Sequence, residues 1–195
     1  MTTLNRNRLL NAVVFFAENV RFCGKIKLFK LLYLLDFEHF RLTGKSVTGV
    51  EYQAWKFGPV PIELMEKWED MDEDLAGLIH IEAEKIVDHT RQNVVVNPGV
   101  KFQEDDFTPR QLRIMNELVA RFHDTYSEKM IDVTHAQNGA WDRVWQGGNG
   151  AHQVIPYELA VSDEAQDREA VLSVAREQAM YQAALSAARN SPTHF

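Results

Sequence analysis

Apolar residues recur at helical spacing at the start of the chain. Between Leu9 and Ala17 they mark one face of a helix, which predicts a helix over residues 4–19. Residues 21–24 break the pattern, and a second apolar run follows. This run predicts a second helix over residues 25–42. The chain is therefore expected to begin with two helices joined by a short turn.

The second helix has almost no polar side between Leu28 and Phe40. A helix that is apolar on most faces is packed on most faces, so we expect it at the centre of the fold. Gly44 follows closely, and glycine readily adopts the left-handed conformation that ends many helices. Asp36 is the polar exception inside the apolar stretch, where a carboxylate costs free energy unless it is hydrogen-bonded or paired.

Two interpretations of Asp36 are open. In the first, it accepts hydrogen bonds from backbone N–H groups, from the Trp55 indole or from Lys56, and so holds the chain corner at Gly58-Pro59. In the second, it is a catalytic acid that works with a histidine in a hydrolase. The first interpretation is favoured, because no second carboxylate is placed to work with Asp36.

Strand chemistry follows the second helix. The segment from Val50 to Phe57 alternates loosely and carries several aromatic residues, which is typical of a strand. We expect Gly58-Pro59 to stop this strand and a helix to continue from there through Trp68. Residues 78–102 are rich in β-branched residues between turns, which predicts two or three more short strands. These strands could join the first in one small antiparallel sheet.

Helices return in the last part of the chain. Thr108, Pro109 and Gln111 have the pattern of a capping box with proline in the first turn, which predicts the start of a helix. Residues 163–189 are rich in alanine and contain neither proline nor glycine, which predicts a long helix. Its small residues would let this helix pack closely on the domain, on a partner or on a second copy.

These elements predict an α+β fold that is mainly α. We expect a helical core around a central apolar helix, a small antiparallel sheet and a long C-terminal helix. With 195 residues the chain is most simply one domain. We place this domain at residues 1–161, followed by a C-terminal helical extension with a short disordered end at residues 162–195.

Composition narrows the class of protein. The net charge of −7 provides no overall field that attracts phosphates, so nucleic acid is a disfavoured partner. No apolar run reaches the roughly 18 residues of a membrane-spanning helix, so no membrane span is expected. Cys23 is the single cysteine, which fits a reducing cytoplasm. Basic residues gather between Arg6 and Lys45, either as a surface that orients a charged partner or as solvated helix faces.

No pattern of a metal, cofactor or catalytic site is found in the sequence. The seven histidines show no H-x-x-x-H spacing, and no second cysteine is present to complete a zinc site. Walker A, G-x-G-x-x-G and G-x-S-x-G motifs are all absent. The second helix also lacks the polar face that a DNA recognition helix needs. We therefore expect no cofactor and no enzyme activity.

An ordered set of residues resembles the Panacea domain, also called the SocA-like antitoxin domain. The family pattern is a helix reading K-L-x-Y-x-x-D, a glycine turn, a corner reading Y-x-A-x-x-x-G-P-V, and a later T-H segment followed by tryptophan. The likeness covers about residues 8–160. The matching residues are Lys30, Tyr33, Asp36, Gly44, Tyr52, Trp55, Gly58, Pro59, Val60, His135 and Trp141.

The resemblance implies an antitoxin of a toxin–antitoxin pair, acting in the cytoplasm and of prokaryotic or phage type. Members of the family bind and neutralise toxins of unrelated kinds, and some deliver a toxin to a protease. A DNA-binding transcriptional regulator and a proteolytic adaptor are therefore the alternatives to plain neutralisation. A homo-oligomer formed through the C-terminal helix is a further expectation.

We expect the partner to be contacted by the basic N-terminal face or by the C-terminal helix. Partner specificity is expected in the exposed parts of residues 78–102 and of the tail. The candidate partner-binding residues are Arg21, Lys25, Lys27, Lys56, Val171, Leu172 and Met180.

Overall fold

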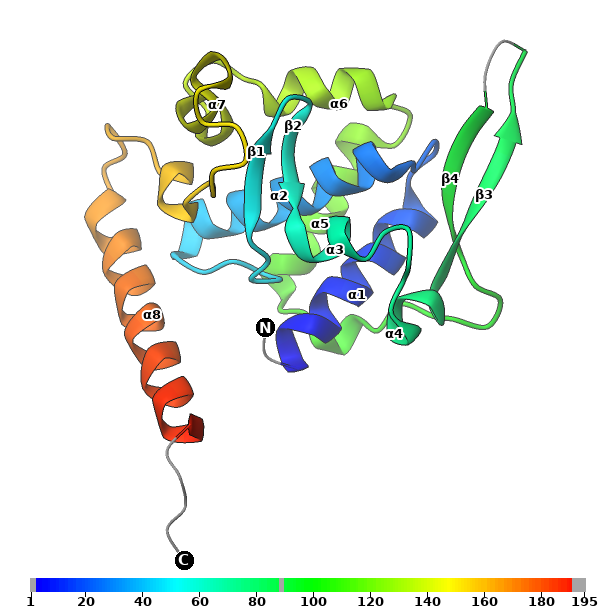
Figure 1. Ribbon diagram of the computed structural model, residues 1–195. Coiled ribbons are helices and arrows are strands. Elements are labelled where there is room, and N and C mark those ends of the chain that lie inside the picture. The colour runs from blue at the N-terminus through cyan, green and yellow to red at the C-terminus, as the bar shows by residue number, and fades with distance from the viewer. Residues whose placement is uncertain (1–2, 88–89, 191–195) are drawn as a thin grey trace, which may run out of the picture.

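One helix forms the centre of the protein. The computed structural model describes residues 3–87 and 90–190. Helix α2 (Lys25–Thr43) is surrounded by α1 (Thr3–Asn19), α5 (Pro109–Phe122) and α6 (Ser127–Thr134), as Figure 1 shows. Twelve of its 19 residues are buried. The predicted positions of the first two helices and the central place of the second are confirmed.

The end of α2 explains why glycine is needed there. Gly44 adopts φ 70°, and its N–H donates to the carbonyl of Phe40 at 2.8 Å. A Cβ at this position would also collide with the carbonyl oxygen of Val171, where the C-terminal helix crosses the end of α2. Both the backbone conformation and the close approach therefore require a residue without a side chain.

The first strands form a hairpin. Strand β1 (Tyr52–Trp55) pairs antiparallel with β2 (Gly58–Pro61), and the turn lies between them. The predicted strand does end before Gly58, but the helix expected directly after it is preceded by β2, because prolines are tolerated on an edge strand. Helix α3 (Ile62–Glu66) begins only after this second strand and ends before the predicted position.

The later strands form a separate hairpin. After α4 (Glu73–Ala76), β3 (Ile79–Lys85) pairs antiparallel with β4 (Thr90–Val96). The prediction of one sheet was wrong, since the two hairpins share no strand. The physical reason is that the free edge of β1 is already occupied: the Ala54 N–H donates to the carbonyl of Gln153 at 2.9 Å.

The last third of the chain is helical. The predicted capping box at the start of α5 is confirmed, with Thr108 and Gln111 bonded reciprocally. The remaining short elements are η1 (Glu104–Asp106), α7 (Ala140–Trp145), η2 (Gln146–Gly148) and η3 (Tyr157–Ala160). Within the described chain, no helix combines the length and the apolar character needed to cross a membrane.

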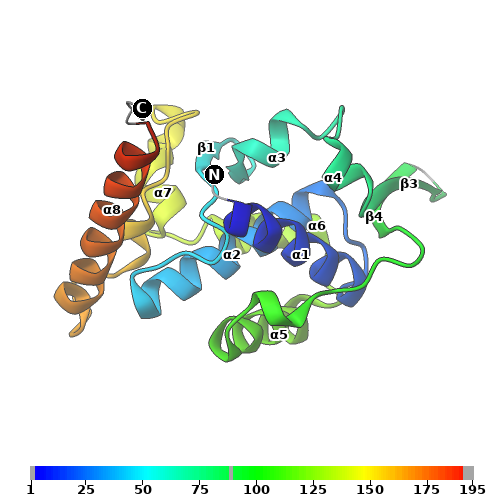
Figure 2. The ribbon, with the colours of Figure 1, turned by 90° about the horizontal axis from the view of Figure 1, so that it is seen from below.

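The C-terminal helix stands apart from the main core. Helix α8 (Arg168–Asn190) begins five residues after the predicted start at residue 163 and leans away from the body (Figures 1 and 2). Its first turns pack on the end of α2 through a small cluster of its own. The expected disordered end, residues 191–195, lies outside the described residues. The cluster is formed by Phe40, Val161, Val171 and Leu172.

Candidate functional site

Asp36 holds the loop that follows α2. Its carboxylate is fully buried and accepts hydrogen bonds from the backbone N–H groups of Val47 and Thr48, at 2.7 and 2.8 Å. The hydroxyls of Thr48 and Tyr52 donate to its other oxygen, at 2.5 and 2.8 Å. Burial raises the pKa of Asp36, and these four donors oppose the shift.

Asp36 is therefore structural, but its partners differ from two of those expected. Backbone N–H groups do donate to it, whereas Trp55 and Lys56 do not. It ties α2 to the turn at Val47 and Thr48 and not to the corner at Gly58-Pro59. A carboxylate sealed from solvent in this way has no access to a substrate, which removes the hydrolase alternative built on it.

Lys30 holds the corner instead. Its ammonium group is buried and donates to the carbonyl of Pro59 at 2.9 Å. Gly58 has φ 97°, and a Cβ there would lie 2.7 Å from Lys30 Nζ and 2.9 Å from Thr134 Oγ1. Burial lowers the pKa of Lys30 to about 7, so a large fraction of this side chain is neutral near neutral pH.

An aromatic stack fixes α7 beside this corner. The indole N–H of Trp141 donates to the carbonyl of Trp55 at 3.0 Å. The rings of His135 and Trp141 lie parallel, with centroids 3.6 Å apart. Burial, and then the charge of Lys30, lower the pKa of His135, whose Nε2 has no hydrogen-bond partner among the described residues. The polar family residues thus connect α2, the first hairpin and the α6–α7 segment.

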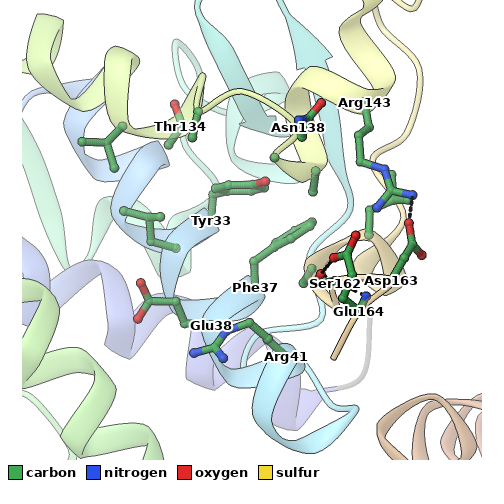
Figure 3. A pocket seen from close by; sticks show the side chains of 17 residues that line it. Tyr33, Phe37, Glu38, Arg41, Thr134, Asn138, Arg143, Ser162, Asp163 and Glu164 are labelled. Atoms are coloured by element: carbon green, nitrogen blue, oxygen red, sulfur yellow. Dashed lines mark hydrogen bonds and ion pairs between the residues drawn. The ribbon is translucent and has the colours of Figure 1, made fainter. Parts of the chain in front are cut away.

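The surface next to this scaffold carries an open groove of about 590 Å³ (Figure 3). Tyr33 and Phe37 of α2 form its floor, and both side chains are about 6% exposed. The α6–α7 segment with Asn138 forms one wall, and the segment after η3 forms another. An aromatic floor between walls that mix apolar and polar residues fits the usual form of a binding site.

Charged residues stand around the rim of the groove. Glu38 and Arg41 lie at one end, and at the other Arg143 pairs with Asp163 at 3.4 Å. Burial raises the pKa of Glu38, while nearby arginines oppose this shift. Both signs of charge are present, so the rim can select a partner by the arrangement of its charges.

The side chains that line the groove limit the chemistry open to it. Its lining contains Thr134 and Ser162, but no histidine or cysteine. Over residues 3–87 and 90–190, no three histidine, cysteine or carboxylate side chains are grouped to hold a metal ion. What the groove can do chemically is to accept apolar side chains between charged neighbours.

Four of the candidate partner-binding residues lie on the surface. Arg21 pairs with the exposed Asp124 at 3.0 Å, and its side chain is 63% exposed. Lys25 lies over the Trp68 ring, Lys56 is exposed beside β1, and Met180 is 73% exposed on α8. The structure does not bring these four together at one place with the groove.

Three candidates are buried, so their assignment to a binding surface was wrong. Lys27 is fully buried, with its ammonium group donating to the carbonyls of Arg21 and His123 at 2.6 and 3.0 Å. Burial lowers its pKa to about 8. Val171 and Leu172 are 6% and 8% exposed, because they anchor α8 on α2.

A second surface feature was not predicted from the sequence. Phe22 has φ 57°, which is rare for an aromatic residue, and its ring stacks on Tyr126 at 4.6 Å. The guanidinium of Arg91 lies 4.5 Å from the Phe22 ring centroid. These residues line a groove of about 700 Å³. Because they come from three distant segments, no local pattern could reveal the cluster.

Comparison with known proteins agrees with this architecture. The sequence matches the family described as antitoxin SocA-like, Panacea domain, over residues 28–142. This range contains α2 from Leu28 onward, both hairpins and the aromatic stack, and it ends within α7. No curated protein and no solved structure gives a significant match. The chain belongs to the SocA-like antitoxin family with a Panacea domain.

Proposed function

We propose that this protein is an antitoxin that neutralises a cognate protein toxin by direct protein–protein binding. Membership of the SocA-like family is the observation that carries the proposal. The structure supports the proposal, because the polar residues of the family pattern make hydrogen bonds inside the fold. The surface features left for function are grooves and exposed elements, which suit binding to another macromolecule.

The groove over Tyr33 and Phe37 is our proposed toxin-binding site. Its floor is apolar and its rim carries paired charges, as at the centre and edge of many protein interfaces. The exposed candidates Arg21, Lys25 and Met180 lie outside it and would add secondary contacts. Binding of this kind needs no cofactor and no enzyme activity.

Co-expression with the product of the adjacent gene tests the proposal. The wild type should restore growth and co-purify with the toxin. Arg41→Glu, at the rim of the groove, should weaken the complex about tenfold by placing a like charge near Glu38 and in the contact. Arg113→Glu, on the exposed side of α5 and outside the groove, is the matched control and should bind normally. Growth arrest with the wild type present would reject the proposal for this pair.

Two alternatives within the same family are separated by simple assays. A transcriptional regulator would bind the promoter DNA of its own operon in a salt-dependent way. Burial of most of α2 and the charge of −7 both speak against this. A proteolytic adaptor would shorten the lifetime of the toxin in cells that hold the protease, whereas plain neutralisation leaves the amount of toxin unchanged.

The organisation of the chain is part of the proposal. We infer that residues 1–161 form the Panacea domain and that residues 162–195 are a C-terminal extension, located in the cytoplasm with the rest of the chain. The start of α8 is anchored on this domain through a small cluster separate from the main core. A homo-oligomer through α8 remains a prediction, which sedimentation of a protein shortened at residue 167 would test.

A further inference from the structure

The second hairpin presents one strand to solvent. In Figures 1 and 2, β3 is the outermost strand and β4 lies between it and the body of the protein. Helices α1 and α2 pack against β4, and β3 pairs with β4 alone. Residues 82–85 of β3 are exposed. The outer edge of this seven-residue strand is therefore accessible to solvent over residues 82–85.

The direction of the backbone groups follows from two hydrogen bonds. The Asn97 N–H donates to the carbonyl of Leu78 at 2.8 Å, so the backbone N–H and C=O groups of these two residues point toward each other. The direction of the backbone groups alternates along an antiparallel ladder. The N–H and C=O groups of residues 80, 82 and 84 consequently point toward β4. On β4, the Val94 N–H points out of the hairpin, to the carbonyl of Cys23 at 2.7 Å.

The odd-numbered residues of β3 therefore turn their backbone N–H and C=O groups to the outer edge. Ile81 faces Val94 in the register, and both turn their backbone groups out of the hairpin. By the same alternation, Ala83 and Lys85 offer N–H and C=O groups to a further strand. The edge contains no proline, and its register runs without a bulge, so two common devices that block strand addition are missing.

The side chains of β3 define what can pair there. Ile79, Ile81 and Ala83 lie on one face of the strand, and Glu82 and Glu84 lie on the other. Glu84 already accepts from Asn93 at 3.0 Å and lies 3.4 Å from the Arg91 guanidinium, across the hairpin. Glu82 and Glu84 are both exposed, so their carboxylates are accessible to the side chains of an added strand.

A second copy of this chain fits the edge poorly. In the antiparallel self-pairing that overlaps all seven residues, Glu82 would face Glu82 of the other copy. Lys85 would face Ile79 in the same register. Like charges directly opposite one another destabilise a strand pair, and both copies carry a net charge of −7.

We propose that the outer edge of β3 is a docking strand for an extended segment of the toxin, in which apolar residues alternate with lysine or arginine. Main-chain hydrogen bonds to Ile81, Ala83 and Lys85 would supply affinity, as in other strand additions. Basic residues opposite Glu82 and Glu84 would supply specificity. This inference rests on the proposed antitoxin function and names the chemistry of the partner.

A synthetic probe tests the edge without the toxin. The probe is a labelled, capped peptide of about nine residues in which lysine alternates with valine. It should bind the full chain by fluorescence anisotropy, with an affinity that falls as salt is added. A peptide of the same composition with all lysines in one block should not bind, because its lysines and valines would each be divided between the two faces of the strand.

Two variants locate the binding. Ala83→Pro removes an outward N–H without removing a donor to β4, and should weaken peptide binding about tenfold. Ala83→Val keeps the N–H and should bind as the wild type does. Glu82→Lys combined with Glu84→Lys should weaken the lysine peptide about tenfold and gain binding of the matching glutamate–valine peptide. Equal peptide binding by Ala83→Pro and the wild type would overturn the proposal.

The toxin assay separates this proposal from the antitoxin function. If the wild type fails to rescue growth, the function fails, whatever the peptide shows. If the wild type and Ala83→Pro protect cells and bind the toxin equally well, the docking strand is wrong while the function stands. A wild-type dimer that Ala83→Pro dissociates would make a second copy the occupant, and would also overturn the proposal.

Discussion

Replacing Asp36 by alanine removes the acceptor of four buried donors at once. Two of these donors are backbone N–H groups, of Val47 and Thr48, which cannot turn toward another partner. The other two are hydroxyls, which can rotate but remain buried. Each buried donor without a partner costs about 1–3 kcal/mol, and removing the desolvated carboxylate offsets part of the sum. We expect Asp36→Ala to lose about 3–5 kcal/mol of unfolding free energy.

Asp36→Asn separates hydrogen bonding from charge. The amide oxygen of asparagine can accept from both backbone N–H groups, and its NH₂ can donate to the oxygens of Thr48 and Tyr52. The two backbone bonds are kept, but the hydroxyl hydrogens of Thr48 and Tyr52 lose their acceptor, so we expect an intermediate loss of about 1–3 kcal/mol. Asp105→Ala, an exposed aspartate, is the control and should change the free energy by less than about 0.5 kcal/mol.

Urea unfolding followed by tryptophan fluorescence measures these differences. The pH dependence adds an independent check. Because burial raises the pKa of Asp36, the folded protein holds this proton to higher pH than the unfolded chain does. The stability of the wild type relative to Asp36→Asn should therefore fall as pH rises from about 4 through the raised pKa. A relative stability that increases with pH, or a loss below about 1 kcal/mol for Asp36→Ala, would refute this reasoning.

Three further outcomes are expected. Burial lowers the pKa of Lys30 from 10.5 to about 7, so unfolding takes up a proton between these pH values. The free energy of unfolding, measured in urea, should therefore rise with pH across this range, and Lys30→Met should flatten the rise. Gly44→Ala should lower the free energy of unfolding more than Gly99→Ala and should increase hydrogen exchange in α8. Both glycines have positive φ, but only Gly44 is crowded by α8; equal losses of unfolding free energy would contradict this. Trp141→Phe should lose about 1 kcal/mol by thermal unfolding with its indole N–H bond to β1, and an unchanged midpoint would speak against that bond.

Local patterns in the sequence predicted the parts of the fold that depend on local physics. The apolar run of α2 and the capping box at Thr108 are decided within a few residues, and both are confirmed. The first hairpin was missed because Gly58-Pro59 was taken to end the strand and lead directly into a helix, although Gly58 to Pro61 form β2. Proline is excluded from central strands but tolerated at an edge, and the sequence alone did not show that β2 is an edge strand.

The lysines of α2 show what sequence reasoning could not reach. Lys27 and Lys30 stand in an apolar run, where lysine usually marks the solvent side. Their burial depends on carbonyl groups brought by distant segments, at His123 and Pro59. Such partners appear only once the chain has folded, which is why Lys27 was assigned to a binding surface.

The polar anchors of the core bind mostly to backbone atoms. Asp36 accepts N–H groups of the following turn, Lys30 and Lys27 donate to carbonyls, and Trp141 donates to the carbonyl of Trp55. A backbone group is the same whatever side chain the residue carries. The contacted loops can therefore exchange their side chains over evolutionary time without loss of these bonds. A core of this kind can keep its internal hydrogen bonds while the surface side chains change to bind a different toxin.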